Sequence, residues 1–317
     1  DIHLPHLGPL RVTARLLIAD AYRALGRDDP DLLCKDIEAI CGVADHASEI
    51  KFSICGLVGL QIRNTAYGVI NDVLFSDSDK FEDRHLEILF DVLDTGSDLR
   101  LISLDSGSYE GLDLIQRIYT DDGRGGGHLT PALFPVIGSE ETDGWLFGEG
   151  LLQRVMASAY LAGGASEFPN RAEFTRLADS AYRRYEHDLI TPKRQHVESG
   201  QANEWDDLEQ YSELAQILII IAVPNHEGIR WSIDRSDGIR VALMAGIALE
   251  RYRRDHGVWV ESLEQLMPTY LTALPVDPFT GKPAFYKIVN GHPLIYSVGA
   301  DRDDDGGSIP INPHTGK

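Results

Sequence analysis

The chain has 317 residues, of which 43% are hydrophobic and 25% are charged, as is usual for a folded globular protein. Its formal net charge of −21 argues against a nucleic-acid partner, because phosphate contacts need lysine and arginine, and it favours cations or basic partners. The longest apolar run, residues 217–223, is far shorter than the ~18–20 residues that a membrane-spanning helix needs.

The first two thirds of the chain are predicted to form an array of helices. Apolar residues recur at helical spacing in successive segments, several of which open on acidic residues, serine or proline and end at glycine. These segments are 9–30, 28–47, 49–75, 78–96, 109–122, 145–164, 170–190 and 203–224. Because most of the connections between them are short and polar, we expect neighbouring helices to pack as hairpins.

The pattern changes at Ser236 to that of a small α+β module. One amphipathic helix is predicted from Ser236 to Gly257, with the serine and the following aspartate as its N-terminal cap, and a short helix ends at Pro268. Two β-rich runs flank Asn290-Gly291, a pair typical of a two-residue hairpin turn. We therefore predict a long helix packed on a short antiparallel sheet. The predicted parts of the chain are a helical domain (1–203), a connecting helix and linker (204–235) and the α+β module (236–317).

Three cysteines in the first quarter of the chain are predicted to be buried thiols that pack as small hydrophobic side chains. They are Cys34, Cys41 and Cys55. Their odd number and the absence of a CxxC pair argue against a disulfide framework or a zinc site.

An acidic cluster follows the second predicted strand directly. Its members are Asp301, Asp303, Asp304 and Asp305. Alternate aspartates followed by Gly306 match the first half of a calcium-binding loop, in which the carboxylates converge on the ion and the glycine provides the bend. The twelfth position counted from Asp301 is Asn312 rather than glutamate, so an ordinary EF-hand is not expected. The alternative is a solvated acidic segment without metal.

The C-terminal module also resembles the soluble head of the major pseudopilin of type II secretion systems. The matching elements, in chain order, are Tyr252–Asp255–Gly257, Leu263 and Leu266, Leu274–Pro275–Asp277–Pro278, Gly281–Pro283, Tyr296–Ser297–Gly299–Ala300–Asp301 and Gly306–Gly307. A head of this kind after a helical domain is similar to envelope proteins of planctomycete-type bacteria that carry such a tail. The pilin leader and the full membrane stem are missing from this sequence, so assembly into filaments by the usual pilin route is not expected.

The resemblance implies that the loop after the last strand binds calcium, with Asp301 as a ligand and Asp303 and Asp305 as further ligands. Whether Asp304 replaces one of them, or backbone carbonyls complete the site, stays open. Such an ion would be structural, because a ligand that binds only the native state stabilises it. The resemblance also implies an extracytoplasmic location on the periplasmic face of the cell envelope, where weak calcium sites are filled. A membrane anchor would have to precede Asp1.

Two short motifs invite an enzymatic interpretation. Residues 94–97 read Asp-Thr-Gly-Ser, the signature of aspartic proteases, and Asp105 begins a similar Asp-Ser-Gly. Two aspartates that share a proton can activate water, and the glycine-rich loop 121–144 could serve as a lid or simply as a flexible connection. The flanks of both motifs are helical in pattern, however, so we predict that Gly96 ends a helix.

Three functional hypotheses follow. The leading one is a non-enzymatic scaffold or interaction protein of the cell envelope, with protein partners and a calcium-stabilised, pseudopilin-like head. The second is a hydrolase with an aspartate-based site between the domains, using Asp94 or Asp105. The third is a helical adaptor whose acidic loop holds no metal.

Overall fold

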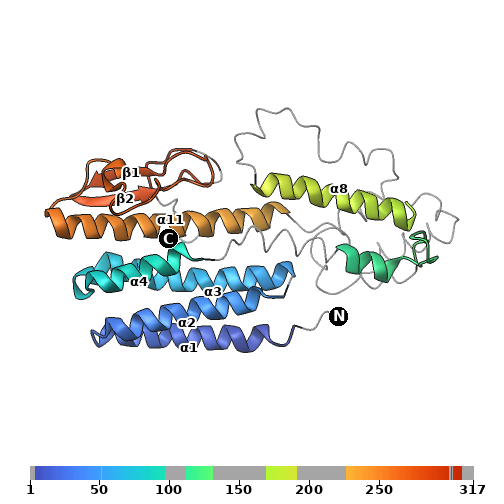
Figure 1. Ribbon diagram of the computed structural model, residues 1–317, viewed down its shortest axis with the longest axis horizontal. Coiled ribbons are helices and arrows are strands. Elements are labelled where there is room, and N and C mark those ends of the chain that lie inside the picture. The colour runs from blue at the N-terminus through green and yellow to red at the C-terminus, as the bar shows by residue number, and fades with distance from the viewer. Residues whose placement is uncertain are drawn as a thin grey trace, which may run out of the picture. The chain divides into compact units, whose positions relative to one another are not determined.

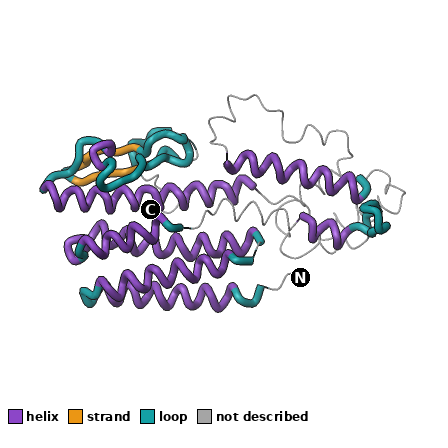
Figure 2. The backbone as a smooth tube through the Cα atoms, viewed as in Figure 1, coloured by secondary structure: helices purple, strands orange, loops and turns teal. Residues whose placement is uncertain are grey.

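The computed structural model describes residues 4–50, 52–96, 111–130, 169–190, 226–299, 301 and 303–308. This part of the chain is mainly helical and carries one small antiparallel sheet near the C-terminus, which confirms the predicted fold class in outline (Figures 1 and 2). The chain forms two compact units. The first contains Asp1–Ile102, Thr191–Glu198 and Glu227–Lys317, and the second contains Ser103–Ile190 and Ser199–His226.

Four helices open the first unit. They are α1 (Leu7–Gly26), α2 (Pro30–Ser48), α3 (Ser53–Asp72) and α4 (Asp83–Asp94). The start of α2 follows from its sequence, because Pro30 occupies the first turn and the side chain of Asp29 accepts a hydrogen bond from the amide of Leu32 at 3.1 Å. Helices α1, α2 and α3 pack against one another and enclose a common apolar core.

Helices α2 and α3 approach closely at Gly59. A Cβ atom at this position would lie 2.6 Å from the carbonyl oxygen of Ala44 on α2, a distance that side-chain carbons do not adopt. The three cysteines lie on α2 and α3 as buried thiols within this core, as predicted. Burial raises the pKa of the Cys34 thiol to about 12 and that of the Cys41 thiol to about 11, so neither is a reactive thiolate at neutral pH.

The first turn of α4 is fixed by a buried histidine. The Nδ1 atom of His85 accepts a hydrogen bond from the backbone amide of Glu82 at 3.0 Å, and its Nε2 atom lies 3.1 Å from Oδ1 of Asp31 on α2. The hydrogen bonds from His85 and Arg84 hold the pKa of Asp31 below its usual value. Both ring nitrogens of His85 therefore have structural roles: Nδ1 caps α4, and Nε2 links α4 to α2.

The long helix α11 (His226–His256) is shared by two apolar cores. Leu243 and Ile247 belong to the core formed with α1–α4, whereas Ala248 and Leu249 belong to the core of the C-terminal module. Figure 1 shows α11 between the C-terminal hairpin on one side and α3 and α4 on the other. One helix thus joins the helical array to the C-terminal module within a single compact unit.

A cluster of charged side chains secures the C-terminal end of α11. The carboxylate of Glu250 is buried and accepts hydrogen bonds from the guanidinium groups of Arg253, at 2.7 and 2.8 Å, and of Arg254, at 3.0 Å. Arg254 also donates to the carbonyl oxygens of Ser78 and Phe81, at 2.6 and 2.7 Å. These two carbonyls lie in the short segment between α3 and α4, so the cluster ties α11 to the helical array.

The predicted start of this helix at Ser236 was wrong. Helix α11 runs unbroken through this position, and Ser236 does not cap a helix. Its side chain is buried and donates a hydrogen bond to Oδ1 of Asn64 on α3 at 2.6 Å. The serine resembles a cap in the sequence because the same hydroxyl can bond to a backbone amide or across a helix interface.

The C-terminal module follows α11 and agrees with the predicted order of elements. It contains a short 3₁₀ turn, η6 (Leu263–Leu266), and the strands β1 (Phe285–Val289) and β2 (His292–Tyr296), which pair antiparallel along their whole length. The backbone φ angles of Asn290 and Gly291 are 52° and 82°, the positive values that a two-residue hairpin turn requires. The predicted hairpin is therefore confirmed.

The second unit has a small apolar core of its own. A helical segment at 111–118 leads into a bridge between Tyr119 and Leu129, and helix α8 (Arg171–Ile190) supplies Phe174. The ring of Tyr119 packs against that of Phe174, with ring centroids 5.3 Å apart.

The first part of the glycine-rich loop belongs to this second unit and forms a closed turn. The carboxylate of Asp122 accepts hydrogen bonds from the amides of Arg124 and Gly126, at 2.8 and 2.9 Å. Residues 121–130 are thus held by local contacts, while the rest of the loop, 131–144, lies outside the described residues.

No helix in the described ranges has the length and apolar character needed to cross a membrane. The apolar run 217–223 lies outside those ranges.

The close approach at Gly59 predicts a clear difference between two glycines of α3. We expect Gly59→Ala to lower the free energy of unfolding by about 1–3 kcal/mol, because the new methyl group collides with the backbone of α2. Gly68→Ala is the control, since a Cβ there meets nothing within 4 Å, and we expect it to raise the free energy of unfolding by about 0.5–1 kcal/mol. Urea unfolding followed by circular dichroism measures both, and equal effects would contradict the packing of α2 on α3.

Candidate functional site

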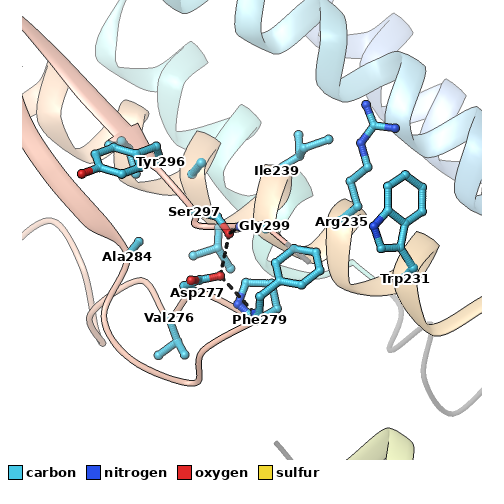
Figure 3. Close-up of a pocket in the computed structure, with 15 residues that line it drawn as sticks. Trp231, Arg235, Ile239, Val276, Asp277, Phe279, Ala284, Tyr296, Ser297 and Gly299 are labelled. Carbon is cyan, nitrogen blue, oxygen red and sulfur yellow. Dashed lines mark hydrogen bonds between the residues drawn. The ribbon is translucent and has the colours of Figure 1, made fainter. Parts of the chain in front are cut away.

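A groove lies between the N-terminal half of α11 and the C-terminal module (Figure 3). Its volume is about 370 Å³, within the range of roughly 300–1,000 Å³ that ligand-binding pockets occupy. Helix α11 contributes Trp231, Arg235 and Ile239 to the lining, and the C-terminal module contributes Phe279 and Tyr296. Most of the lining is apolar, so the groove favours an apolar ligand surface.

The wall on the side of the C-terminal module is organised by Asp277, whose side chain is 1% exposed. Its Oδ1 atom accepts hydrogen bonds from the amide of Phe279 at 3.0 Å and from the hydroxyl of Ser297 at 2.7 Å, both drawn in Figure 3. Its Oδ2 atom accepts from the hydroxyl of Thr280 at 3.0 Å. These three donors offset the cost of burying the carboxylate.

The same carboxylate joins two segments that are distant in the sequence. Asp277 lies in the Leu-Pro-Val-Asp-Pro turn, and Ser297 directly follows β2. Their hydrogen bond holds the turn against the end of the strand, so that both can face α11. Asp277 therefore shapes the groove, and it needs no ligand to satisfy its charge.

The opposite wall is the face of α11. Gly238 allows the turn to approach the helix, because a Cβ there would already contact Pro278 at 3.4 Å. Toward the N-terminus of the helix, Trp231 is 46% exposed, and the guanidinium carbon of Arg235 lies 5.5 Å from the centroid of its ring. This pair places an aromatic face and a cation at the mouth of the groove (Figure 3).

The guanidinium group of Arg235 forms no ion pair within the described residues, unlike that of Arg240 on the same helix. Arg240 pairs with Asp237 at 2.8 Å, whereas no carboxylate in the described part of the chain pairs with Arg235. Arg235 and Asp277 are the charged residues of the lining, and Asp277 is saturated by its donors. The mouth of the groove is consequently cationic, on a chain whose net charge is −21.

The acidic cluster at the C-terminus is held by local hydrogen bonds. All four of its aspartates are exposed. The carboxylate of Asp301 accepts from the amide of Asp303 at 3.3 Å, and that of Asp304 accepts from the amide of Gly306 at 2.9 Å. These are turn-forming contacts of the kind that aspartates make with amides two residues later.

The end of this acidic loop is fastened to the hairpin. The Nζ atom of Lys287 on β1 donates to the carbonyl oxygen of Gly306 at 2.7 Å and lies 5.3 Å from the centroid of the Tyr296 ring. Gly307, at a φ of 72°, passes so close to that ring that a Cβ would come within 3.0 Å of it. The two glycines therefore allow the loop to lie flat on the sheet.

The acidic loop has the ligand type that a calcium site needs but not the arrangement. Four carboxylates are the hard oxygen ligands that calcium prefers. Within the described residues, however, no three acidic, histidine or cysteine side chains come together in a way that could hold a metal ion. Calcium binding by Asp301, Asp303, Asp304 and Asp305 stays a prediction, and it would require their side chains to turn toward one point.

The protease-like motif at residues 94–97 marks the end of a helix, as predicted. Asp94 is the last residue of α4 and is exposed. The amide and hydroxyl of Thr95 both bond to the carbonyl oxygen of Asp91, at 2.8 and 2.7 Å, which closes the final turn. Asp105, its proposed partner, lies outside the described residues.

The α11 side of the groove is not among the site residues predicted from the sequence. Trp231 and Arg235 were assigned to a linker, although their spacing of four residues continues the helical period of the segment after Ser236. That spacing was the available signal. The role of Asp277 could not be read in this way, because it depends on a contact with a residue 20 positions away.

Comparisons with models of known protein families, with characterised proteins and with solved structures give no match for this chain. The resemblance of the C-terminal module to pseudopilin heads therefore rests on the order of its sequence motifs.

The three hydrogen bonds of Asp277 predict that this residue is a structural centre. We expect Asp277→Ala to lower the free energy of unfolding by about 1–3 kcal/mol, because buried donors lose their acceptor, and Ser297→Ala to lower it by about 0.5–1.5 kcal/mol. Glu261→Ala, an exposed acidic residue of the same module, is the control and should change it by less than about 0.5 kcal/mol. Chemical unfolding measures all three, and a neutral Asp277→Ala would contradict the assignment.

The acidic loop gives a second prediction. If calcium binds there, a concentration ten times its dissociation constant adds about 1.4 kcal/mol of stability and raises the melting temperature by about 2–4 °C over that in chelator. Asp301→Ala should remove the difference, and Glu261→Ala should keep it. Calorimetry in calcium, magnesium and chelator makes the measurement. Equal melting temperatures in calcium, magnesium and chelator would contradict calcium binding and favour the hypothesis of a helical adaptor whose acidic loop holds no metal.

Proposed function

We propose that this chain is a non-enzymatic interaction protein of the cell envelope, in which a helical scaffold carries a pseudopilin-like head that calcium stabilises. The observation that carries the proposal is the groove beside α11. It combines an exposed tryptophan, an arginine that pairs with no carboxylate among the described residues, and an apolar floor. A partner that binds there would cover its apolar surface.

The residues at the mouth of the groove are of the types that dominate protein interfaces. Tryptophan, tyrosine and arginine are enriched among the residues that contribute most to binding energy, and here Trp231, Arg235 and Tyr296 line one hollow. Val276 lines the same hollow from the C-terminal module and is 46% exposed, which adds to the accessible apolar surface. Exposed apolar surface with a polar rim is typical of interaction sites.

Both walls of the groove are held in place by contacts within the protein, which favours specific binding over adaptable contact. The helix wall is fixed by its packing on α1–α4 and by the Glu250 cluster. The other wall is fixed by the hydrogen bonds of Asp277. A preformed surface loses little conformational entropy on binding, so more of the contact energy contributes to affinity.

The envelope location and the pseudopilin-like head are supported by the sequence motifs of the C-terminal module. The Leu-Pro-Val-Asp-Pro turn and the Tyr-Ser pair, two of the motifs behind the resemblance, meet in the bond between Asp277 and Ser297. The acidic loop that carries the proposed calcium ligands leaves from the end of the same strand. A weak structural calcium site is useful outside the cytoplasm, where the ion is abundant.

Site-specific photo-crosslinking in cells that produce the protein tests the proposal. A photoreactive phenylalanine analogue at Val276, beside the groove, should cross-link to a discrete protein, whereas the same analogue at Val289 on the hairpin should not. Both positions are exposed valines of the C-terminal module, at 46% and 40%. The adduct at Val276 should disappear in the Trp231→Ala, Arg235→Ala double variant. No adduct at Val276, or equal adducts at both positions, would count against a binding role for the groove.

A further inference from the structure

A second hollow, with a volume of about 250 Å³, lies between α1 and α3 and shares no lining residue with the groove beside α11. Its lining includes Arg11 and Arg15 from α1, and Gln61 and Thr65 from α3. We infer that this hollow, called the α1–α3 hollow below, binds the phosphate group of an anionic ligand. The two arginines provide the charge, and Gln61 adds a neutral hydrogen-bond donor.

The guanidinium groups of Arg11 and Arg15 differ from the other cations of these two helices. No carboxylate in the described part of the chain pairs with either of them. Arg23, the next arginine of α1, pairs with Asp20. Arg63 on α3 is buried and pairs with Asp45. Among the described residues of α1 and α3, it is therefore the two arginines of the hollow that are available to an external anion.

The segments that form the α1–α3 hollow contain no acidic residue. Neither residues 4–19 nor residues 53–71 include an aspartate or a glutamate, although the whole chain has 50 of them. The first acidic residue that follows on α3 is Asp72, which accepts a hydrogen bond from the hydroxyl of Tyr22 at 2.7 Å. Because the chain carries a net charge of −21, an anion is repelled by most of its surface, and this basic region is where it can bind.

The number of arginines favours phosphate over carboxylate. A phosphate monoester carries about 1.5–2 negative charges at neutral pH, and guanidinium groups bind phosphate oxygens through paired hydrogen bonds. A carboxylate carries a single charge, which one arginine balances. Ala14 and Ile62, which are buried, form part of the lining. This apolar surface keeps water from one side of a bound anion, so the attraction between the charges is screened less than on an exposed surface.

Exposed apolar side chains beside the arginines point to a phospholipid as the source of the phosphate. Val12 and Leu16 directly follow Arg11 and Arg15 in α1, and they are 53% and 67% exposed. A free phosphate ester in the hollow would leave both uncovered, whereas a lipid headgroup brings an apolar layer with it. Arginines beside exposed apolar residues on one helix are typical of helices that lie on an anionic membrane surface. The phosphate of a headgroup is thus favoured over that of a free ester.

Titration calorimetry of the full chain with glycerol 3-phosphate, in low-salt buffer without phosphate, measures the phosphate contact alone. We expect Arg11→Gln and Arg15→Gln each to weaken binding about tenfold, because each removes a charge-assisted hydrogen bond. Arg27→Gln, at an exposed arginine just after α1, is the control and should leave the affinity unchanged. Succinate, which spreads a similar charge over two carboxylates, should bind about tenfold more weakly than glycerol 3-phosphate.

Flotation with lipid vesicles tests the source of the phosphate. The chain should float with vesicles of equal parts phosphatidylcholine and phosphatidic acid, but not with phosphatidylcholine alone, and added salt should release it. The double variant Arg11→Gln, Arg15→Gln should not float. Leu16→Ser should weaken vesicle binding several-fold and leave the affinity for glycerol 3-phosphate unchanged, because it removes only an apolar contact. Ile288→Ser, at an isoleucine of β1 that is 44% exposed, is the matched control and should change neither.

Three results would overturn the inference. Succinate binding as tight as that of glycerol 3-phosphate would make the hollow a general anion site, equally suited to acidic proteins. Failure to bind either glycerol 3-phosphate or the acidic vesicles would leave no phosphate site. Flotation that the double arginine variant retains would place the membrane contact elsewhere. If glycerol 3-phosphate binds and the vesicles do not, the phosphate site stands with a free ester as its ligand. Flotation that needs both arginines, without binding of glycerol 3-phosphate, supports a headgroup site. Circular dichroism of every variant verifies folding.

Discussion

The first unit depends on the hydrogen-bonded ion pairs that the buried carboxylate of Glu250 forms with Arg253 and Arg254. This carboxylate sits on α11 where this helix passes from the helical array to the C-terminal module, and two guanidinium groups neutralise it. Because Arg254 continues to the carbonyl oxygens between α3 and α4, the rotation of α11 about its own axis is fixed. That rotation decides which side chains face each core and directs Trp231 and Arg235 to the groove. Removing the carboxylate would take from both arginines their one buried partner and leave them the exposed carboxylates of Asp79 and Asp83.

Features of this fold that depend on near neighbours could be predicted from the sequence. The start of α2 is encoded by Asp29 and Pro30, and the hairpin by Asn290-Gly291. In each case the residues that decide the conformation lie within one turn of the position that they control. The presence of a small α+β module at the C-terminus followed from the change of period in the same way.

Features that depend on distant contacts could not be predicted. The hydroxyl of Ser236 resembles a helix cap until its bond to Asn64, 172 residues away, is known. The groove requires α11, the turn at Asp277 and the end of β2 to meet, and the sequence does not state that Asp277 bonds to Ser297. The acidic loop is intermediate. Its spacing suggests a metal, while its described contacts include hydrogen bonds to its own amides, and a lysine on β1 anchors its end.

The sharing of α11 between two apolar cores has a consequence for how the protein unfolds. Leu243 and Ile247 complete the interior of the helical array, and their neighbours Ala248 and Leu249 complete that of the hairpin region. Unfolding of either core exposes apolar side chains of α11, and the other core is then destabilised because it packs against the same helix. The helical array and the C-terminal module should therefore unfold in one cooperative transition. A shortened chain that ends before α11 would expose the apolar side chains of α1–α4 that this helix covers, and it would aggregate. The C-terminal module can be transferred to another protein only together with α11, and only if α11 still packs against the helices that it meets there.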